Sequence, residues 1–133
     1  MIAGVADTHA IVWYLDGDRQ LSSRAKAFIE DAALNGDMVG VSSISLIETI
    51  YLVEKGRLPA ESLARLIAAL ETDKSVFAEI PIDLSVAQAL ARIDRTQVPD
   101  MPDRIIAATA RHANAPIISR DGRIRVAGLE TIW

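Results

Sequence analysis

The sequence of 133 residues contains no cysteine, which excludes disulfide frameworks, cysteine nucleophiles and thiolate-bound zinc or iron–sulfur sites. No apolar run reaches the roughly 18 residues that a membrane-spanning helix needs, and the first residues lack a basic segment followed by an apolar one. Half of the residues are hydrophobic, which is enough for a full core and excludes a disordered chain. We therefore expect a soluble, cytoplasmic protein without a membrane partner, with one domain over residues 1–133.

Lysine is scarce, because Lys26, Lys55 and Lys74 are the only lysines among fourteen basic residues and the rest are arginines. Arginine is the better residue for planar, two-pronged recognition of phosphate. The eighteen acidic residues give a formal net charge of −4, whereas proteins that coat nucleic acid are usually basic. An acidic protein can still act on nucleic acid if metal ions neutralise some of its carboxylates. Net charge therefore does not decide whether nucleic acid is a substrate.

Short apolar segments alternate with helical ones along the whole chain. We predict strands at 2–6, 38–41, 76–82, 116–119 and 129–133, and helices at 8–15, 59–72, 84–95 and 102–114. Two more helices are predicted, one that opens at 21–23 and stops at 35–36, and one that is capped at 43 or 45 and ends at 56. The caps expected for the second and third helices are Ser22 or Ser23, and Ser43 or Ser45. This alternation predicts a three-layer α/β fold, with a parallel sheet of four to five strands flanked by helices. In such sheets functional residues gather at the carboxyl ends of the strands.

The common catalytic motifs of α/β proteins are missing. The sequence has no glycine-rich phosphate-binding loop, neither of the P-loop nor of the dinucleotide-binding kind, and no serine in a nucleophile elbow. The two histidines, His9 and His112, have no partner at metal-ligand spacing, and we expect His9 to be a packed or hydrogen-bonded neighbour. The remaining candidates for chemistry are carboxylates.

Asp7 follows the first predicted strand directly, and Asp121 follows the fourth. Each has a purely structural alternative, since Asp7 can cap a helix and Asp121 can form a turn with Gly122. Glu48 lies in a helix that is apolar almost all round, and this pattern predicts that the helix is buried together with Glu48. Its neighbours one turn away carry no positive charge, so it needs a distant partner, for which an arginine is the structural alternative.

Asp100 and Asp103 lie at the start of the helix predicted at 102–114. Capping explains Asp100 well, and Asp103 suits the positive end of the helix dipole. Asp103 can serve the dipole and bind a metal at the same time. The four acids Asp7, Glu48, Asp103 and Asp121 can therefore converge in one cleft.

Ionised carboxylates that share a pocket need cations to neutralise them. Oxygen ligands without cysteine or a histidine pair select Mg²⁺ or Mn²⁺. Such a site can activate water against a phosphodiester, so the acids point to a metal-dependent nuclease.

Four segments, in order, resemble the PIN-domain family, and in particular the VapC-type toxins of bacterial toxin–antitoxin pairs. These segments are ADTHAIVWYL at 6–15, SSISLIE at 42–48, PDMPDRIIAATA at 99–110 and IISRD at 117–121. The resemblance covers essentially the whole chain. One departure is His9, which stands where many relatives carry asparagine or serine.

The resemblance implies a PIN-like, Rossmann-like fold and a Mg²⁺-dependent endoribonuclease site that Mn²⁺ can also serve. Its catalytic and metal-binding residues would be Asp7, Glu48, Asp103 and Asp121, and its supporting polar residues Thr8, Ser119 and Asp100. The implied partners are an RNA substrate, a cognate antitoxin protein and a second copy of the chain in a homodimer.

Three other functions are compatible with parts of the sequence. A PIN-type nuclease could serve housekeeping RNA processing or DNA cleavage instead of acting as a toxin. The fold could also be a binding module without catalysis, although the presence of all four acids argues against this. A phosphoacceptor receiver domain would use Asp83, but the chain lacks the acidic pair and the late lysine that such a domain needs.

Overall fold

The computed structural model describes residues 1–126 and 128–133, and its centre is a parallel sheet. The five strands lie in the order β3-β2-β1-β4-β5, and each neighbouring pair is parallel. Their bounds are β1 Ile2–Ala6, β2 Met38–Ser42, β3 Phe77–Ile80, β4 Ile117–Ile118 and β5 Thr131–Ile132. The predicted parallel sheet is confirmed.

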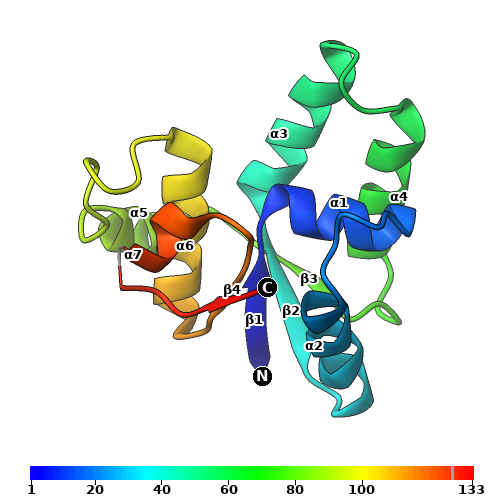
Figure 1. Cartoon of the computed structure of the whole chain (residues 1–133), viewed down its shortest axis with the longest axis horizontal. Coiled ribbons are helices and arrows are strands. Elements are labelled where there is room, and N and C mark those ends of the chain that lie inside the picture. Colours follow the sequence, from blue (N-terminus) through cyan, green and yellow to red (C-terminus); the bar gives the residue numbers. More distant parts are fainter. Residues whose placement is uncertain (127) are drawn as a thin grey trace.

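Seven helices surround the sheet within the described part of the chain. They are α1 Thr8–Asp16, α2 Ser23–Leu34, α3 Ser43–Glu54, α4 Ala60–Glu71, α5 Leu84–Leu90, α6 Met101–Ala113 and α7 Gly122–Val126. Figure 1 shows α5, α6 and α7 on one side of the strands and α1, α2 and α4 on the other. None of the helices in the described ranges is both long and apolar enough to cross a lipid bilayer.

Two hydrophobic clusters, one on each face of the sheet, hold the three layers together. Adjacent residues of a strand point to opposite faces. Accordingly, Val5 and Ile117 belong to the cluster under α5 and α6, whereas Ala6 and Ile118 belong to the cluster under α1, α2 and α4. All four are fully buried. Strands that are apolar on both faces are what a sheet covered on both sides requires, and the three-layer prediction is confirmed.

The helix caps agree with the prediction at α2 and differ at α3. Ser22 Oγ accepts from the Ala25 N–H at 3.0 Å, as expected for the residue before α2. At α3 the cap is Ser42, whose Oγ accepts from the Ile44 N–H at 3.2 Å, and not Ser43 or Ser45. Ser45 is fully buried inside α3 and contacts Thr8 instead.

The region between α5 and α6 also departs from the prediction. The helix predicted to reach residue 95 ends at Leu90, and a tighter turn follows, in which the N–H groups of Arg92 and Ile93 donate to the carbonyls of Ala89 and Leu90. Arg104 donates to the carbonyl oxygens of Ile93 at 3.0 Å and Leu90 at 3.1 Å. Helix α7 was not predicted, because it begins at the glycine of the Asp121-Gly122 pair, which is typical of a turn.

The strand order reverses between β1 and β4, and this reversal positions the site. The chain moves outward from β1 through β2 to β3 and then returns to the other side of β1 with β4. The Asp7 N–H donates to the Ile118 carbonyl at 3.0 Å, which joins the carboxyl ends of β1 and β4. This edge is where ligands bind in open parallel sheets.

Candidate active site

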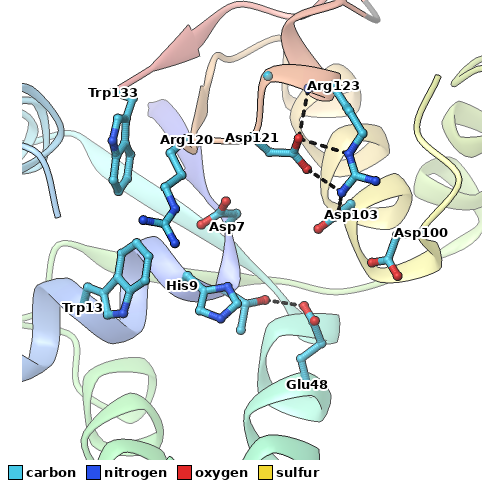
Figure 2. Close-up of a pocket in the computed structure, with 12 residues that line it drawn as sticks. Asp7, His9, Trp13, Glu48, Asp100, Asp103, Arg120, Asp121, Arg123 and Trp133 are labelled. Atoms are coloured by element: carbon cyan, nitrogen blue, oxygen red, sulfur yellow. Dashed lines mark hydrogen bonds and ion pairs between the residues drawn. The ribbon is translucent and has the colours of Figure 1, made fainter. Parts of the chain in front are cut away.

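A cavity of about 530 Å³ opens at the carboxyl ends of β1 and β4. Five acidic residues line it, and they are the four predicted site acids together with one predicted supporting residue: Asp7, Glu48, Asp103, Asp121 and Asp100. Figure 2 shows these side chains approaching from β1, α3, α6 and the segment after β4. The structure therefore brings together residues that are more than 100 positions apart in the sequence.

Asp7 caps α1 and faces the cavity at the same time, so the two interpretations of this residue are compatible. Its Oδ1 accepts from the Ala10 N–H at 2.8 Å. Burial raises the pKa of Asp7 above its ordinary value, and this effect outweighs the hydrogen bonds from Ser119 and Ala10, which act in the opposite direction. The buried Ser119 thus contributes one of the hydrogen bonds to Asp7.

Glu48 is held by Thr8, and not by an arginine. The Thr8 hydroxyl donates to Glu48 Oε1 at 2.5 Å and lies 3.0 Å from Ser45 Oγ. Thr8 and Ser45 are both buried, so this contact fixes the rotamer of Glu48 at the edge of the cavity. Burial raises the pKa of Glu48, and the nearby charges of Asp100 and Asp7 add to the increase.

The prediction that the Glu48 helix is buried all round is wrong. Glu48 is half-buried, and Ile47, Ile50 and Tyr51 on the same helix are 57%, 42% and 54% exposed. The apolar sequence of α3 therefore reflects an uncovered apolar face in addition to its contact with the core.

Asp103 has a strongly raised pKa. It lies in the first turn of α6 and its side chain is 26% exposed. Burial, followed by the charges of Asp100, Asp121, Glu48 and Asp7, raises its pKa to about 7. Asp103 without a bound cation therefore holds its proton to a much higher pH than an ordinary aspartate does. A carboxyl in this state is a marker of clustered negative charge.

Asp100 occupies the predicted cap position of α6, but its side chain forms no capping hydrogen bond. Asp100 is exposed, lines the cavity and faces Asp103, whose pKa its charge raises. The Asp-x-Pro-Asp sequence suits a helix start, which is why the pattern suggested a cap.

Asp121 combines a turn with a position in the cavity. Its N–H donates to Ser119 Oγ at 3.0 Å, and its Oδ1 accepts from the Arg123 N–H at 2.9 Å at the start of α7. The Arg123 guanidinium also reaches Asp121 Oδ1 at 3.3 Å and Asp103 Oδ2 at 3.8 Å. Arg123 therefore bridges the carboxylates of α6 and of the segment after β4 (Figure 2).

The side chains that line the cavity are of the chemical type that binds a hard divalent cation. All of the candidate ligands are carboxylates, with hydroxyls beside them, and these are the groups that Mg²⁺ and Mn²⁺ prefer. As placed, however, no three acidic or histidine side chains among residues 1–126 and 128–133 can hold one ion together. The guanidinium of Arg123 balances two of the acids in this arrangement, so a cation would have to replace it there.

Sequence reasoning missed four residues that line the cavity: Trp13, Arg120, Arg123 and Trp133. The two tryptophan rings lie 6.0 Å apart, and the Arg120 guanidinium lies 4.6 Å from the centre of the Trp13 ring. The available signal was the Arg120-Asp121-Gly122-Arg123 run, in which two cations flank one acid. His9 is exposed, and its ring lies 5.3 Å from that of Trp13, so it is packed against a neighbour.

Comparison with known protein families identifies the family of this chain. The model of the PIN domain family matches residues 5–129. The chain belongs to the PIN-domain family. Its members are nucleases, and the match covers all the acidic residues of the cavity. Asp83, the alternative phosphoacceptor, caps α5 by accepting from the Val86 N–H at 3.0 Å, so the receiver-domain alternative is wrong.

Solved structures of toxin–antitoxin complexes share the PIN fold of this chain. VapBC2 from Rickettsia felis, bound to a promoter DNA fragment, matches with a TM-score of 0.73 and 20% identity over 100% of both chains. FitAcB from Neisseria gonorrhoeae matches with a TM-score of 0.65 and 25% identity over 98% of this chain and 96% of the other. A toxin–antitoxin complex from Klebsiella pneumoniae matches with a TM-score of 0.57 and 22% identity, covering 90% and 87%. A search of curated proteins found no match.

Proposed function

We propose that this PIN domain is an Mg²⁺- or Mn²⁺-dependent endoribonuclease that acts as the toxin of a toxin–antitoxin pair. The observation that carries the proposal is the convergence of Asp7, Glu48, Asp103 and Asp121 on one cavity at the switch point of the sheet. The raised pKa of Asp103, caused by burial and by the neighbouring acids, supports it further. A purely structural set of carboxylates would have no reason to gather where their charges oppose one another.

Each of the four acids has a defined part in this proposal. Asp7, Glu48, Asp103 and Asp121 would hold the cation, and Thr8 keeps Glu48 in its rotamer. When bound, Mg²⁺ or Mn²⁺ supplies an activated water and neutralises charge on the phosphodiester. An acid that is ionised when the cation is present can accept the proton of the attacking water. Attack by water leaves a 5′-phosphate and a 3′-hydroxyl.

The test is cleavage of RNA by the purified chain. We expect cleavage with Mg²⁺ or Mn²⁺, none in EDTA, and 5′-phosphate ends when the products are mapped. Glu48→Gln should lose cleavage, while Glu71→Gln, which removes an exposed acid at the end of α4, should retain it. Products with 2′,3′-cyclic phosphate, or activity that persists in EDTA, would contradict the proposal. Preference for DNA over RNA under the same conditions would support a DNA nuclease instead.

We further propose that the chain forms a homodimer and binds a small antitoxin protein. The related solved structures are toxin–antitoxin complexes. The uncovered apolar face of α3, with Ile47, Ile50 and Tyr51, supports an interface, because exposed apolar patches on soluble domains commonly mark protein contacts.

Sedimentation of the purified chain tests the homodimer, and expression with and without its neighbouring gene tests the antitoxin. We expect a dimer in solution, and growth arrest that co-expression of a small neighbouring gene product relieves. A monomer at micromolar concentration would refute the homodimer. Growth that is unaffected by expression of an active nuclease would favour a role in housekeeping RNA processing.

A further inference from the structure

One wall of the cavity is aromatic and cationic, although the cavity as a whole is acidic. The chain has only six aromatic residues other than histidine, two each of tryptophan, tyrosine and phenylalanine, and both tryptophans line this wall. Trp13 is 6% exposed and Trp133 is half-buried. Figure 2 shows Trp133, Trp13 and Arg120 together on the side of the cavity opposite Asp100 and Asp103.

Arg120 differs from the other arginine of the cavity in having no acidic partner. Arg123 forms ion pairs with Asp103 and Asp121, whereas none of the ion pairs in the described part of the chain involves Arg120. The guanidinium of Arg120 instead lies 4.6 Å from the centre of the Trp13 ring, and the side chain is exposed. An arginine that stacks on an aromatic ring keeps its N–H donors available at its edge, in the plane that suits a phosphate.

The position of Arg120 in the chain fixes it beside the acids. It lies between Ser119, which supports Asp7, and Asp121, directly after β4. On the same Trp13, the exposed His9 ring approaches from α1 at 5.3 Å. His9, Trp13, Arg120 and Trp133 are called the tryptophan wall below.

An RNA phosphate that approaches this cavity meets five carboxylates. Bound cations offset that repulsion only at the reacting phosphate. The phosphate next to it in the chain needs a positive charge of its own, and Arg123 is already paired with two acids. Among the cations that line the cavity, Arg120 is the one left to supply this charge.

We propose that the tryptophan wall binds the nucleotide that adjoins the cleaved bond in single-stranded RNA. Arg120 pairs with the phosphate of that nucleotide, and the exposed part of the Trp133 ring stacks on its base, with His9 at the edge of the same subsite. This inference rests on the proposed ribonuclease function and adds the residues that hold the substrate. Unpaired bases suit such a subsite because they are free to stack on an aromatic side chain.

The test measures binding without cleavage, using a fluorescein-labelled single-stranded RNA oligonucleotide in EDTA at several salt concentrations. Arg120→Gln should weaken binding roughly tenfold and lower the slope of log K against log salt by about one. Arg120→Lys should restore the slope but only part of the affinity, because lysine keeps the charge and loses the planar stack. Trp133→Leu should weaken binding without changing the slope.

The matched control is Arg111→Gln, which removes an exposed arginine from a cavity beside Asn114 and Pro116 at the opposite edge of the sheet. This variant should bind like the wild type. With metal present, Arg120→Gln should raise KM roughly tenfold while kcat stays within about twofold. A purely structural role of Arg120 would change the melting temperature and leave the salt slope and KM unchanged.

Two failures can be told apart. If the wild type cleaves RNA and folded Arg120→Gln has the same affinity, salt slope and KM, the tryptophan wall is refuted and the ribonuclease proposal stands. If the wild type neither binds nor cleaves RNA, both proposals fall.

Discussion

Replacing Asp103 by asparagine should stabilise the metal-free protein at neutral pH and above. A tenfold change in proton affinity is worth about 1.4 kcal/mol, so a pKa raised from 3.8 to about 7 sets an upper bound of about 4 kcal/mol on the cost of ionising Asp103 in the folded state. The folded protein holds this proton more tightly than the unfolded chain. The cost is therefore absent below pH 3.8, grows as the pH rises, and is complete above the folded pKa of about 7.

The substitution also removes favourable contacts that reduce the gain. Asp103 is 3.8 Å from Arg123, whose side chain is 59% exposed, and it lies at the positive end of α6. Each of these contributes roughly 0.3–1 kcal/mol. Solvent screening at a side chain that is 26% exposed lowers the gain further. We therefore expect Asp103→Asn to be about 1–3 kcal/mol more stable than the wild type at pH 8, and equal or slightly less stable at pH 4.

Urea unfolding in EDTA at pH 4, 6 and 8 measures this difference. The control Asp31→Asn removes an exposed carboxylate from α2, outside the cavity, and should differ from the wild type by less than about 0.5 kcal/mol at each pH. RNA cleavage by Asp103→Asn should be lost while the fold is retained. A variant that is destabilised at pH 8 with no change in pH dependence would refute the electrostatic reasoning. Full cleavage by the folded variant would refute the proposed site.

Three further substitutions test the site. Millimolar Mn²⁺ should raise the melting temperature of the wild type and leave that of Asp7→Asn unchanged, because an ion that binds only the folded state stabilises that state. An equal rise in both proteins would mean that the ion binds elsewhere. Thr8→Val should cost about 1–3 kcal/mol in urea unfolding and reduce cleavage, because Ser45 and Glu48 lose their buried partner; unchanged stability and cleavage would contradict this role. Arg123→Gln should strengthen Mn²⁺ binding in calorimetry, because the guanidinium no longer competes for the acids, whereas weaker binding would mean that Arg123 helps to hold the site open.

The fold was predictable because apolar strands alternate with helices along the whole chain, as a parallel sheet covered by helices requires. Alternating apolar strands and helices predicted the strand positions to within a few residues, and Asp7 and Asp121 stood out because each follows a strand directly. The end of α5 was not predictable, since the apolar spacing continues past Leu90 and the contacts of Arg104 with the carbonyls of Leu90 and Ile93 come from a different helix and exist only in the folded chain.

The acids of the site were accessible to sequence reasoning, but their partners were not. A carboxylate in an apolar helix signals a need for a partner without naming it, and the partner of Glu48 is the threonine beside Asp7. The capping pattern at Asp100 located the start of α6 but not the direction of the side chain, for a related reason. The backbone of Asp100 starts α6, whereas its side chain faces Asp103. The orientation of this side chain depends on contacts that only the folded chain forms.

The clustered carboxylates that destabilise the metal-free site should also favour the binding of a cation. Cation binding should therefore be linked to the release of protons from these carboxylates. With its pKa raised to about 7, Asp103 is partly protonated near neutral pH, and a carboxyl must lose its proton to bind a cation. Binding of Mn²⁺ at pH 7 should therefore release protons from Asp103, and the affinity should increase from pH 6 to pH 8. Calorimetry in buffers of different ionisation enthalpy measures the number of protons released. Asp100→Asn removes a charge that raises the pKa of Asp103, so it should lower the proton release and flatten the pH dependence. Metal binding without proton release at pH 7 would show that Asp103 is already ionised, and that the acids of the cavity repel one another less than their placement implies.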